Sequence, residues 1–365
     1  MIKVIDLFSG VGGMSLGAAK AGFTVSGAVE LDPIAIKTHA INFPKTKHLN
    51  FDISKLTGAD LLETFNITRG EAVGIIGGPP CQGFSYMGKQ DINDPRNFLF
   101  LHFFRLINEI RPSFFVAENV PGILDKKYDQ LRNNAFALVE KHYDLLPHST
   151  INAKEVGAPT TRTRVFFIGI NKLISSQLTS LPIFGTKTQT KQYNVQDALF
   201  GLPEVVDDRT DYWLDYNSNE GTYSDILSRL IPDGVGNETA ISNWINLKIN
   251  GMIGTKHTEE VINRFKQVPP GSIDKISRAP RLKADGFCPT LRAGTGSDKG
   301  SYQAVRPIHP SEDRVITPRE AARLQGFPDW FQFHHTKWHS FRQIGNSVSP
   351  IVSEYIFSRL IKHLT

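Results

Sequence analysis

A loop of small and rigid residues surrounds Cys81, one of only two cysteines in this chain of 365 residues. The segment GGPPCQGFS (residues 77–85) follows an apolar run at 73–76; its glycines permit a tight turn and its prolines stiffen the approach to the thiol. A loop at a strand end is where a nucleophilic thiolate is expected. An inert free cysteine is the common alternative, and this segment alone does not decide between the two. The setting of Cys288, Gly-Phe-Cys-Pro, favours the inert alternative.

Two further segments place ionisable side chains beside apolar runs. ENV (118–120) follows the run 114–117, and TRTR (161–164) directly precedes another run. Glu118 is placed near the same sheet edge as Cys81, although a capping or surface carboxylate is the usual fate of a glutamate. Arg162 and Arg164 alternate by two, so on an extended segment both would face one side and could bind a phosphate or a base carbonyl. A pair of exposed arginines is the common alternative.

A glycine-rich turn, DLFSGVGG (6–13), joins an apolar run to a helical segment, and such a turn lets a nucleotide approach the backbone closely. Glu30 ends the next apolar run, where a carboxylate can accept both hydroxyls of a ribose. Asp52 and Ile53 follow, placed to hold an adenine amino group. The G-x-G-x-x-G order typical of NAD-binding turns is absent. A cofactor with a ribose and an adenine but no pyrophosphate, such as S-adenosylmethionine, therefore fits better, and a turn that binds nothing stays open.

The glycine-rich turn, Glu30, the loop of Cys81 and Glu118 each follow a predicted strand. Strands are predicted at 3–8, 25–29, 73–76, 114–117 and 165–170, and helices at 14–21, 33–42 and 98–110. Strands spaced by helices in this way predict an α/β fold with a doubly wound, mostly parallel, Rossmann-like sheet. Ligands of such sheets bind beyond the carboxyl ends of the strands, where the candidate residues lie.

The remainder of the chain differs in composition and in hydrophobic periodicity. Residues 175–300 have weak periodicity and many Gly, Pro, Asn, Ser and Thr residues, so a second, irregular domain is expected. A capped helix is predicted at 317–327, with Thr317 as its N-cap and Glu320 three residues later. A final amphipathic helix is predicted at 350–364.

The formal net charge of +5 averages two unlike regions. Residues 197–238 hold ten acidic and two basic side chains, whereas residues 245–345 hold sixteen basic and nine acidic ones. We expect the acidic stretch to face away from any nucleic acid and the basic stretch to meet it. Two cysteines exclude a disulfide framework and a Cys-rich zinc fold, and no metal is expected. No apolar run is long enough for a membrane span or a signal core, so we expect a cytoplasmic protein.

The motifs match one family in order and spacing. The chain resembles the DNA (cytosine-5)-methyltransferases of bacterial restriction–modification systems along nearly its whole length. DLFSGVGG is similar to the family's cofactor loop, PPCQGFS to its catalytic loop, ENV to its glutamate motif and TRTR to its Q-x-R-x-R motif. TPREAARLQGF (317–327) and QIGNSVSP (343–350) are similar to the motifs that close the recognition region and return to the cofactor. Thr160 departs from the pattern, because the family usually has glutamine there, so the role of that residue is not carried over.

The resemblance implies a chemistry for four residues. Cys81 would add as a thiolate to carbon 6 of cytosine and so make carbon 5 nucleophilic. Glu118 would contact N3 and the exocyclic amino group, and Arg164, with Arg162 beside it, would hold the O2 oxygen. The target base must be flipped out of the duplex to reach this pocket.

The resemblance also implies S-adenosylmethionine as cofactor. The residues expected to bind it are Phe8, Ser9, Gly10, Val11, Gly12, Gly13, Glu30, Leu31, Asp52, Ile53, Pro80, Leu99, Asn346, Ser347 and Val348.

The expected division is a catalytic and cofactor-binding domain at 1–174, completed by 340–365, and a smaller target-recognition domain at 175–339. The expected DNA contacts are Gln82, Ser85, Arg281, Lys283, Arg292 and Thr295. The expected partner is double-stranded DNA, with a separate cognate restriction endonuclease, and the protein itself is expected to be a monomer. A tRNA methyltransferase of the same architecture is the main alternative, although the long recognition stretch favours DNA. A binding protein on an inactive methyltransferase fold is the other, and the intact Cys81, Glu118 and Arg164 argue against it.

Overall fold

A central eight-stranded sheet organises the computed structural model, which describes residues 2–68, 71, 73–80, 97–175, 191–205, 212–217, 219–293 and 306–364. The strand order is β3-β2-β1-β4-β5-β8-β6, with β7 paired to β8. The strands are β1 (Lys3–Leu7), β2 (Thr24–Glu30), β3 (Lys47–Asn50), β4 (Val73–Gly77), β5 (Phe114–Asn119), β6 (Tyr143–Leu145), β7 (Ser149–Asn152) and β8 (Thr163–Asn171). Strands β3, β2, β1, β4 and β5 are parallel, and β8 runs antiparallel to β5, which confirms the predicted mostly parallel sheet.

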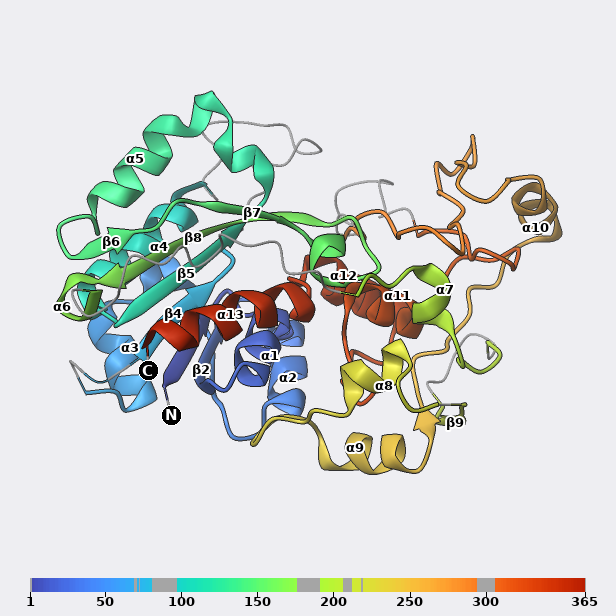
Figure 1. The fold of residues 1–365 in the computed structure, drawn as a ribbon, viewed down its shortest axis with the longest axis horizontal. Helices are drawn as coiled ribbons and strands as arrows, with labels where there is room; N and C mark the ends of the chain where they lie inside the picture. The colour runs from blue at the N-terminus through green and yellow to red at the C-terminus, as the bar shows by residue number, and fades with distance from the viewer. Residues whose placement is uncertain are drawn as a thin grey trace.

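Helices cover both faces of this sheet (Figure 1). One face carries α1 (Gly13–Lys20), α2 (Pro33–Asn42) and α13 (Pro350–Leu364), and the other carries α3 (Gly58–Phe65), α4 (Asn97–Ile110) and α5 (Asp129–Ala137). The short α6 (Lys172–Ser175) follows β8. The contact between α1 and α13 is close at Gly17, where a Cβ atom would lie 2.2 Å from Cβ of Ser353. The C-terminal helix therefore packs directly on α1, on one face of the sheet.

The second half of the chain is built from short elements. They are α7 (Val195–Leu199), β9 (Leu214–Asp215), α8 (Tyr223–Ser228), α9 (Glu238–Ile245), β10 (Lys248–Ile249), α10 (Glu259–Lys266), α11 (Pro318–Gln325) and α12 (Lys337–Asn346). A small separate core forms beside α10, with Phe265, Val268 and Ile308 among its buried residues. Most other buried residues of this half join the core of the sheet domain. None of the described helices is both long and apolar enough to cross a membrane.

Helix α11 has the caps that its sequence predicts. The Thr317 hydroxyl accepts from the Glu320 N–H at 3.3 Å, and the Thr317 N–H donates to the Glu320 carboxylate at 2.7 Å. The helix ends at Gly326, whose φ of 92° suits glycine. The boundaries of α2 and α13 also agree with the predicted 33–42 and 350–364.

A buried ion pair joins α11 to the segment that follows it, and the same arginine contacts the segment after α7. The Arg323 guanidinium donates to both carboxylate oxygens of Asp329 at 2.8 Å, and the two side chains are 0% and 1% exposed. Arg323 also donates to the backbone carbonyl of Phe200 at 2.7 Å. Removing one partner of such a pair leaves a charge buried without compensation.

We therefore expect Asp329→Ala to lower the free energy of unfolding by about 3–5 kcal/mol, measured by urea denaturation. The matched control is Asp233→Ala, which breaks the exposed pair with Lys45 and should change stability by less than about 1 kcal/mol. Equal losses in the two variants would contradict the structural role of the Arg323–Asp329 pair.

Candidate active site

Parallel pairing brings the ends of four strands to one edge of the sheet. Leu7, at the end of β1, lies opposite Val29 of β2 and Gly77 of β4. Gly77 in turn lies opposite Ala117 of β5. The last residues of these strands and the segments that follow them therefore meet at this edge; they include residues 8–13, 30–32, 78–80 and 118–119. Cys81, Gln82, Ser85 and Thr295 lie outside the described residues.

The glycine-rich turn after β1 has an unusual backbone. Phe8 has a φ of 63°, which is uncommon for an aromatic residue, and Gly10 and Gly12 have φ values of 55° and 100°. A Cβ atom on Gly12 would lie 2.4 Å from the Phe43 ring, so only glycine fits there. No atom of the described residues lies within 4 Å of the corresponding position on Gly10, so the described part of the chain leaves that side of the turn open.

The Glu30 carboxylate holds this turn from β2. One oxygen accepts the Gly10 N–H at 2.9 Å, and the other accepts the Asp32 N–H at 2.8 Å. Burial raises the pKa of Glu30, while these N–H donors lower it. The Ser9 hydroxyl is buried and has no hydrogen-bond partner among the described residues. The turn thus presents an oriented carboxylate and an unsatisfied hydroxyl, both suited to polar groups of a ligand.

A network of buried polar side chains adjoins the two ends of the glycine-rich turn. The Ser15 hydroxyl donates to the Asp6 carboxylate at 2.6 Å and lies 3.1 Å from Nε2 of His39. Burial raises the pKa of Asp6 to about 7. Sequence reasoning missed this support, because a single polar residue inside an apolar strand carries no local signal of its partners.

The segment QIGNSVSP (343–350) packs against the same glycine-rich turn. A Cβ atom on Gly13 would lie 2.3 Å from the backbone oxygen of Val348, so this close approach requires glycine. The backbone oxygen of Ser347 accepts from the Gln325 side chain at 2.9 Å. Residues 347–348 are buried, and Asn346 beside them is exposed.

The other expected cofactor residues lie on several different elements. Asn50 of β3 donates to the backbone oxygens of Glu30 and Leu31, which ties the segment before Asp52 to the end of β2. The Asp52 carboxylate caps the following 3-10 turn by accepting from the N–H and hydroxyl of Ser54. The remaining positions are Leu31, 64% exposed; Ile53, buried; Pro80, half-buried after β4; and Leu99, half-buried in the first turn of α4.

Glu118 and Arg164 form a close ion pair beside the segment that leads to Cys81. Nε of Arg164 lies 2.6 Å from a Glu118 carboxylate oxygen, and the two side chains are only 13% and 11% exposed. The other Glu118 oxygen would lie 2.8 Å from a Cβ atom on Gly78. The Asn119 side chain donates to the backbone oxygen of Pro79 at 3.4 Å. The Glu118 carboxylate thus occupies the space that the glycine leaves free, three residues before Cys81.

Arg162 binds different partners from Arg164. Its side chain is 4% exposed and donates to the backbone oxygens of Leu291 at 3.1 Å and Gly345 at 3.0 Å. These contacts join the start of β8 to the recognition segment and to the end of α12. The geometry favours a positioning role for Arg162 over direct contact with a base.

Thr160, the position that departs from the family pattern, contacts the recognition segment. Its hydroxyl donates to the backbone oxygen of Cys288 at 3.0 Å, and the Cys288 N–H donates to the backbone oxygen of Pro159 at 2.9 Å. Thr160 therefore fastens the recognition segment to the segment that carries the arginines. Cys288 itself is fully buried, and burial raises the pKa of its thiol, which is consistent with an inert cysteine.

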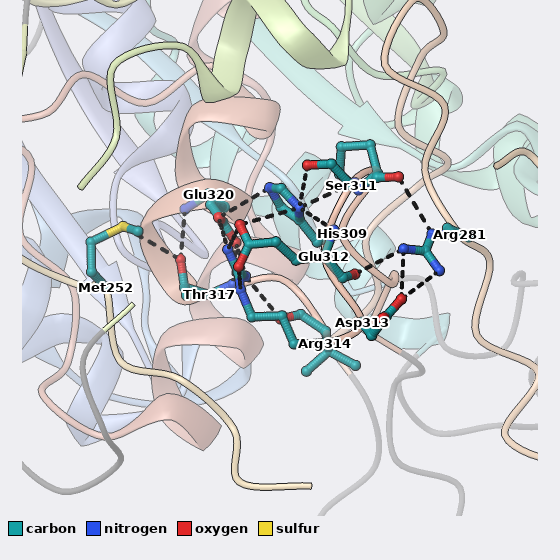
Figure 2. A network of polar contacts seen from close by, with 11 residues as sticks. Met252, Arg281, His309, Ser311, Glu312, Asp313, Arg314, Thr317 and Glu320 are labelled. Atoms are coloured by element: carbon teal, nitrogen blue, oxygen red, sulfur yellow. Dashed lines mark hydrogen bonds and ion pairs between the residues drawn. The ribbon is translucent and has the colours of Figure 1, made fainter. Parts of the chain in front are cut away.

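Arg281 lies inside a polar network and not on the surface (Figure 2). It is 7% exposed, pairs with Asp313 at 2.9 Å and donates to the backbone oxygen of Phe265 at 2.8 Å. The network continues through Arg314, which pairs with Glu320 at 2.8 Å (Figure 2). We therefore assign Arg281 to the folding of the recognition region, and this corrects the DNA contact expected from the sequence.

The other two described DNA candidates remain accessible. Lys283 is exposed and lies 3.2 Å from Asp285. Arg292 is exposed, and its backbone packs against α12, because a Cβ atom on Gly345 would lie 2.5 Å from the backbone of both Arg292 and Ala293. Arg292 therefore lies on the side of the recognition region that meets Arg162.

Comparisons with known proteins agree with this geometry. Residues 2–362 match the family model described as C-5 cytosine-specific DNA methylase. The chain is 37% identical to the type II methyltransferase M.XorII of Xanthomonas oryzae, covering 99% of this chain and 84% of that one. It is 30% identical to the type II methyltransferase M.DdeI of Desulfomicrobium norvegicum, covering 98% and 88%. A crystal structure of an E. coli prophage protein, classed as a DNA modification methyltransferase, aligns with a TM-score of 0.90 and 49% identity over 100% of this chain and 99% of that one.

Proposed function

The chain belongs to the C-5 cytosine-specific DNA methylases, and from this membership we propose the chemistry of its site. In this proposal the protein transfers a methyl group from S-adenosylmethionine to carbon 5 of a cytosine flipped out of a specific double-stranded DNA sequence. The observation that carries the proposal is the Glu118–Arg164 pair, which lies beside the segment leading to Cys81 and at the same sheet edge as the glycine-rich turn.

The turn offers groups that fit S-adenosylmethionine. The Glu30 carboxylate is held by two backbone N–H groups and can accept the hydroxyls of a ribose, and the open face at Gly10 leaves room for a ligand beside it. The buried Ser9 hydroxyl lacks a partner in the described part of the chain, which a polar ligand group would supply. When bound, the cofactor supplies an electrophilic methyl group. Residues 346–348 and Asp52 would complete the enclosure.

Cys81 is the proposed nucleophile. Its thiolate adds to carbon 6 of the cytosine, and the electron pair of the C5–C6 double bond becomes available at carbon 5. After carbon 5 has been methylated, its proton is lost, the double bond re-forms and the bond from carbon 6 to the Cys81 sulfur breaks. The thiolate is thereby regenerated, so the enzyme turns over.

Glu118 and Arg164 would act on the ring of the same base. The Glu118 carboxyl group contacts N3 and the exocyclic amino group and shares a proton with N3 as the thiolate adds. Arg164 neutralises the charge that develops at O2. Their pairing in the free protein orients the carboxylate before the base arrives. Arg162 would maintain this orientation through its contacts with Leu291 and Gly345.

Residues 175–339 are the proposed target-recognition domain. Lys283 and Arg292 are accessible for contacts with phosphates or base edges, and Gln82, Ser85 and Thr295 remain candidates from the sequence. Contacts of this kind must offset the cost of unstacking the target cytosine, which is a few kcal/mol. In this proposal the protein acts as a monomer in the cytoplasm of a prokaryotic cell. Its methylation of the target DNA protects those sites from a separate endonuclease.

The role of Glu30 gives a prediction on cofactor binding. Glu30→Ala removes the acceptor for the ribose hydroxyls and the anchor of the Gly10 N–H. Because hydrogen bonds to a charged group are worth about 1.5–3 kcal/mol, the KM for S-adenosylmethionine should rise about 10- to 100-fold. Initial rates at saturating DNA measure this change. Glu71→Ala, which breaks the partly exposed pair with Lys3, is the control and should leave the KM unaltered. An unchanged KM in Glu30→Ala would remove Glu30 from the cofactor site.

Labelled S-adenosylmethionine tests the proposed function directly. We expect transfer of label to duplex plasmid DNA and none to bulk tRNA, and bisulfite sequencing should then locate one methylated sequence. Label in tRNA alone would favour the tRNA methyltransferase of the same architecture, and label in neither would favour an inactive binding protein.

A further inference from the structure

Two cationic side chains converge where α12 begins. The Lys337 ammonium group donates to the backbone oxygen of Gly254. The Arg306 guanidinium donates to the Thr255 hydroxyl at 3.5 Å and lies 4.2 Å from the centroid of the Phe341 ring. Since Gly254 and Thr255 are neighbours, the two positive charges are held close together by one short piece of backbone.

The local field at this place is positive. Burial lowers the pKa of His257, and the charges of Lys337, Arg264 and Arg306 lower it further. Nε2 of His257 accepts the Val315 N–H at 3.3 Å, so its proton resides on Nδ1. With Nε2 accepting this hydrogen bond, the imidazole adds no charge of its own to that of the cations around it.

Arg306 differs in its partners from four other arginines of residues 245–345. Arg264, Arg281, Arg314 and Arg323 each pair with a carboxylate. Within the described part of the chain, the contacts of Arg306 are a hydroxyl and an aromatic ring, and no carboxylate lies within ion-pair distance of it. Burial lowers the pKa of Arg306. A partly buried cation without an anion is costly, so such a group is suited to an anion supplied by a ligand.

The surface beside these cations has the composition of a nucleic-acid-binding face. Residues 334–342 carry histidines, a tryptophan and an arginine, with His334 stacked on His335 and Arg342 over the Trp338 ring. The same helix α12 ends beside Arg162 and Arg292, at Gly345. Lys337 and Gly345 are eight residues apart, so about 12 Å of helix separates the cation cluster from the contact between Gly345 and Arg162. This spacing suits contact with the same DNA duplex near the target base.

We propose that Arg306 and Lys337 bind one phosphate of the DNA backbone. This proposal rests on the proposed function. The phosphate supplies Arg306 with the anion that the described fold does not provide, and Lys337 is held beside it by Gly254. Because the contact is to a phosphate, it sets the position of the duplex on the protein and carries no sequence information. Sequence reasoning missed these residues, because they lie 31 positions apart (306 and 337) and only the broad basic excess of residues 245–345 pointed to the region.

The salt dependence of DNA binding tests the phosphate site. We expect Arg306→Gln or Lys337→Gln in the full-length protein to reduce the slope of log Kd against log salt, and the double variant to reduce it by about 0.9 in magnitude, which is the contribution of one phosphate. The same relation predicts about a 5- to 10-fold weaker affinity near 0.1 M salt. The loss should be equal for duplexes with and without the target sequence. Lys248→Gln, which removes a lysine paired with Asp215, is the matched control and should leave the slope unchanged.

The variant Arg306→Lys distinguishes the effect of the positive charge from the effect of side-chain packing. It keeps the positive charge but not the shape of the guanidinium on Phe341, so a phosphate contact predicts a wild-type slope. A slope that falls equally in Arg306→Lys and Arg306→Gln would overturn the proposal, and so would unchanged slopes in both Gln variants. If the wild type methylates duplex DNA and the variants bind DNA with the wild-type salt slope, only the proposal of the phosphate site is wrong. If the wild type neither binds nor methylates duplex DNA, the proposed function fails as well.

Discussion

Cys81→Ala is expected to abolish methyl transfer, with kcat falling by about four orders of magnitude or more. Carbon 5 of cytosine is a weak nucleophile until a thiolate adds at carbon 6, and no other described thiol can replace Cys81, because Cys288 is fully buried. Affinity for the cofactor should persist, because the residues proposed to bind it lie mainly in the turn, at Glu30 and at 346–348.

Single-turnover rates with labelled S-adenosylmethionine measure the effect of Cys81→Ala. The second cysteine provides a matched control: Cys288→Ala should retain near wild-type rates and lose only about 1 kcal/mol of stability from the small cavity. Transfer at the wild-type rate by Cys81→Ala would refute the covalent mechanism.

Glu118→Gln should have the second-largest effect, a fall in kcat of about 10²- to 10⁴-fold. The amide has nearly the same shape, but it cannot share a proton with the ring nitrogen as the thiolate adds. It also leaves Arg164, which is only 13% exposed, without its anion. The KM for S-adenosylmethionine should change little, because Glu118 is not among the residues proposed to bind the cofactor.

The control for Glu118→Gln is a second arginine–glutamate pair away from the site. Arg105 and Glu109 of α4 lie 2.7 Å apart, and Glu109→Gln should leave kcat near the wild-type value. If Glu118→Gln retained the wild-type rate constant of chemistry, the carboxyl group would have no role in activating the base.

The parts of the fold that could be predicted carry their signals locally. The first strand, its glycine turn and the following helix are contiguous in sequence, and α11 shows its cap within four residues. The convergence of Glu30, Pro80 and Glu118 on one edge followed from the rule that parallel strands end together. Short elements such as β3, with the sequence KHLN, have no alternating pattern and were not predicted.

The parts that could not be predicted depend on contacts between distant residues. Arg281 sits in a basic stretch that resembles a DNA-binding loop, but its partner Asp313 is 32 positions away and buries it. Thr160 and Cys288 are 128 positions apart, so no local pattern indicates that one fastens the other. The pairing of Glu118 with Arg164 likewise depends on the antiparallel register of β5 and β8.

A trapping experiment tests the covalent Cys81 mechanism most directly. Plasmid DNA copied with 5-fluoro-dCTP in place of dCTP carries 5-fluorocytosine at each copied cytosine, including the target cytosine. The fluorine at carbon 5 cannot leave as the proton does. After incubation with S-adenosylmethionine, we predict a denaturation-resistant protein–DNA complex whose attachment maps to Cys81 by mass spectrometry. Absence of this complex in a preparation that methylates ordinary DNA, or attachment at another residue, would contradict the mechanism.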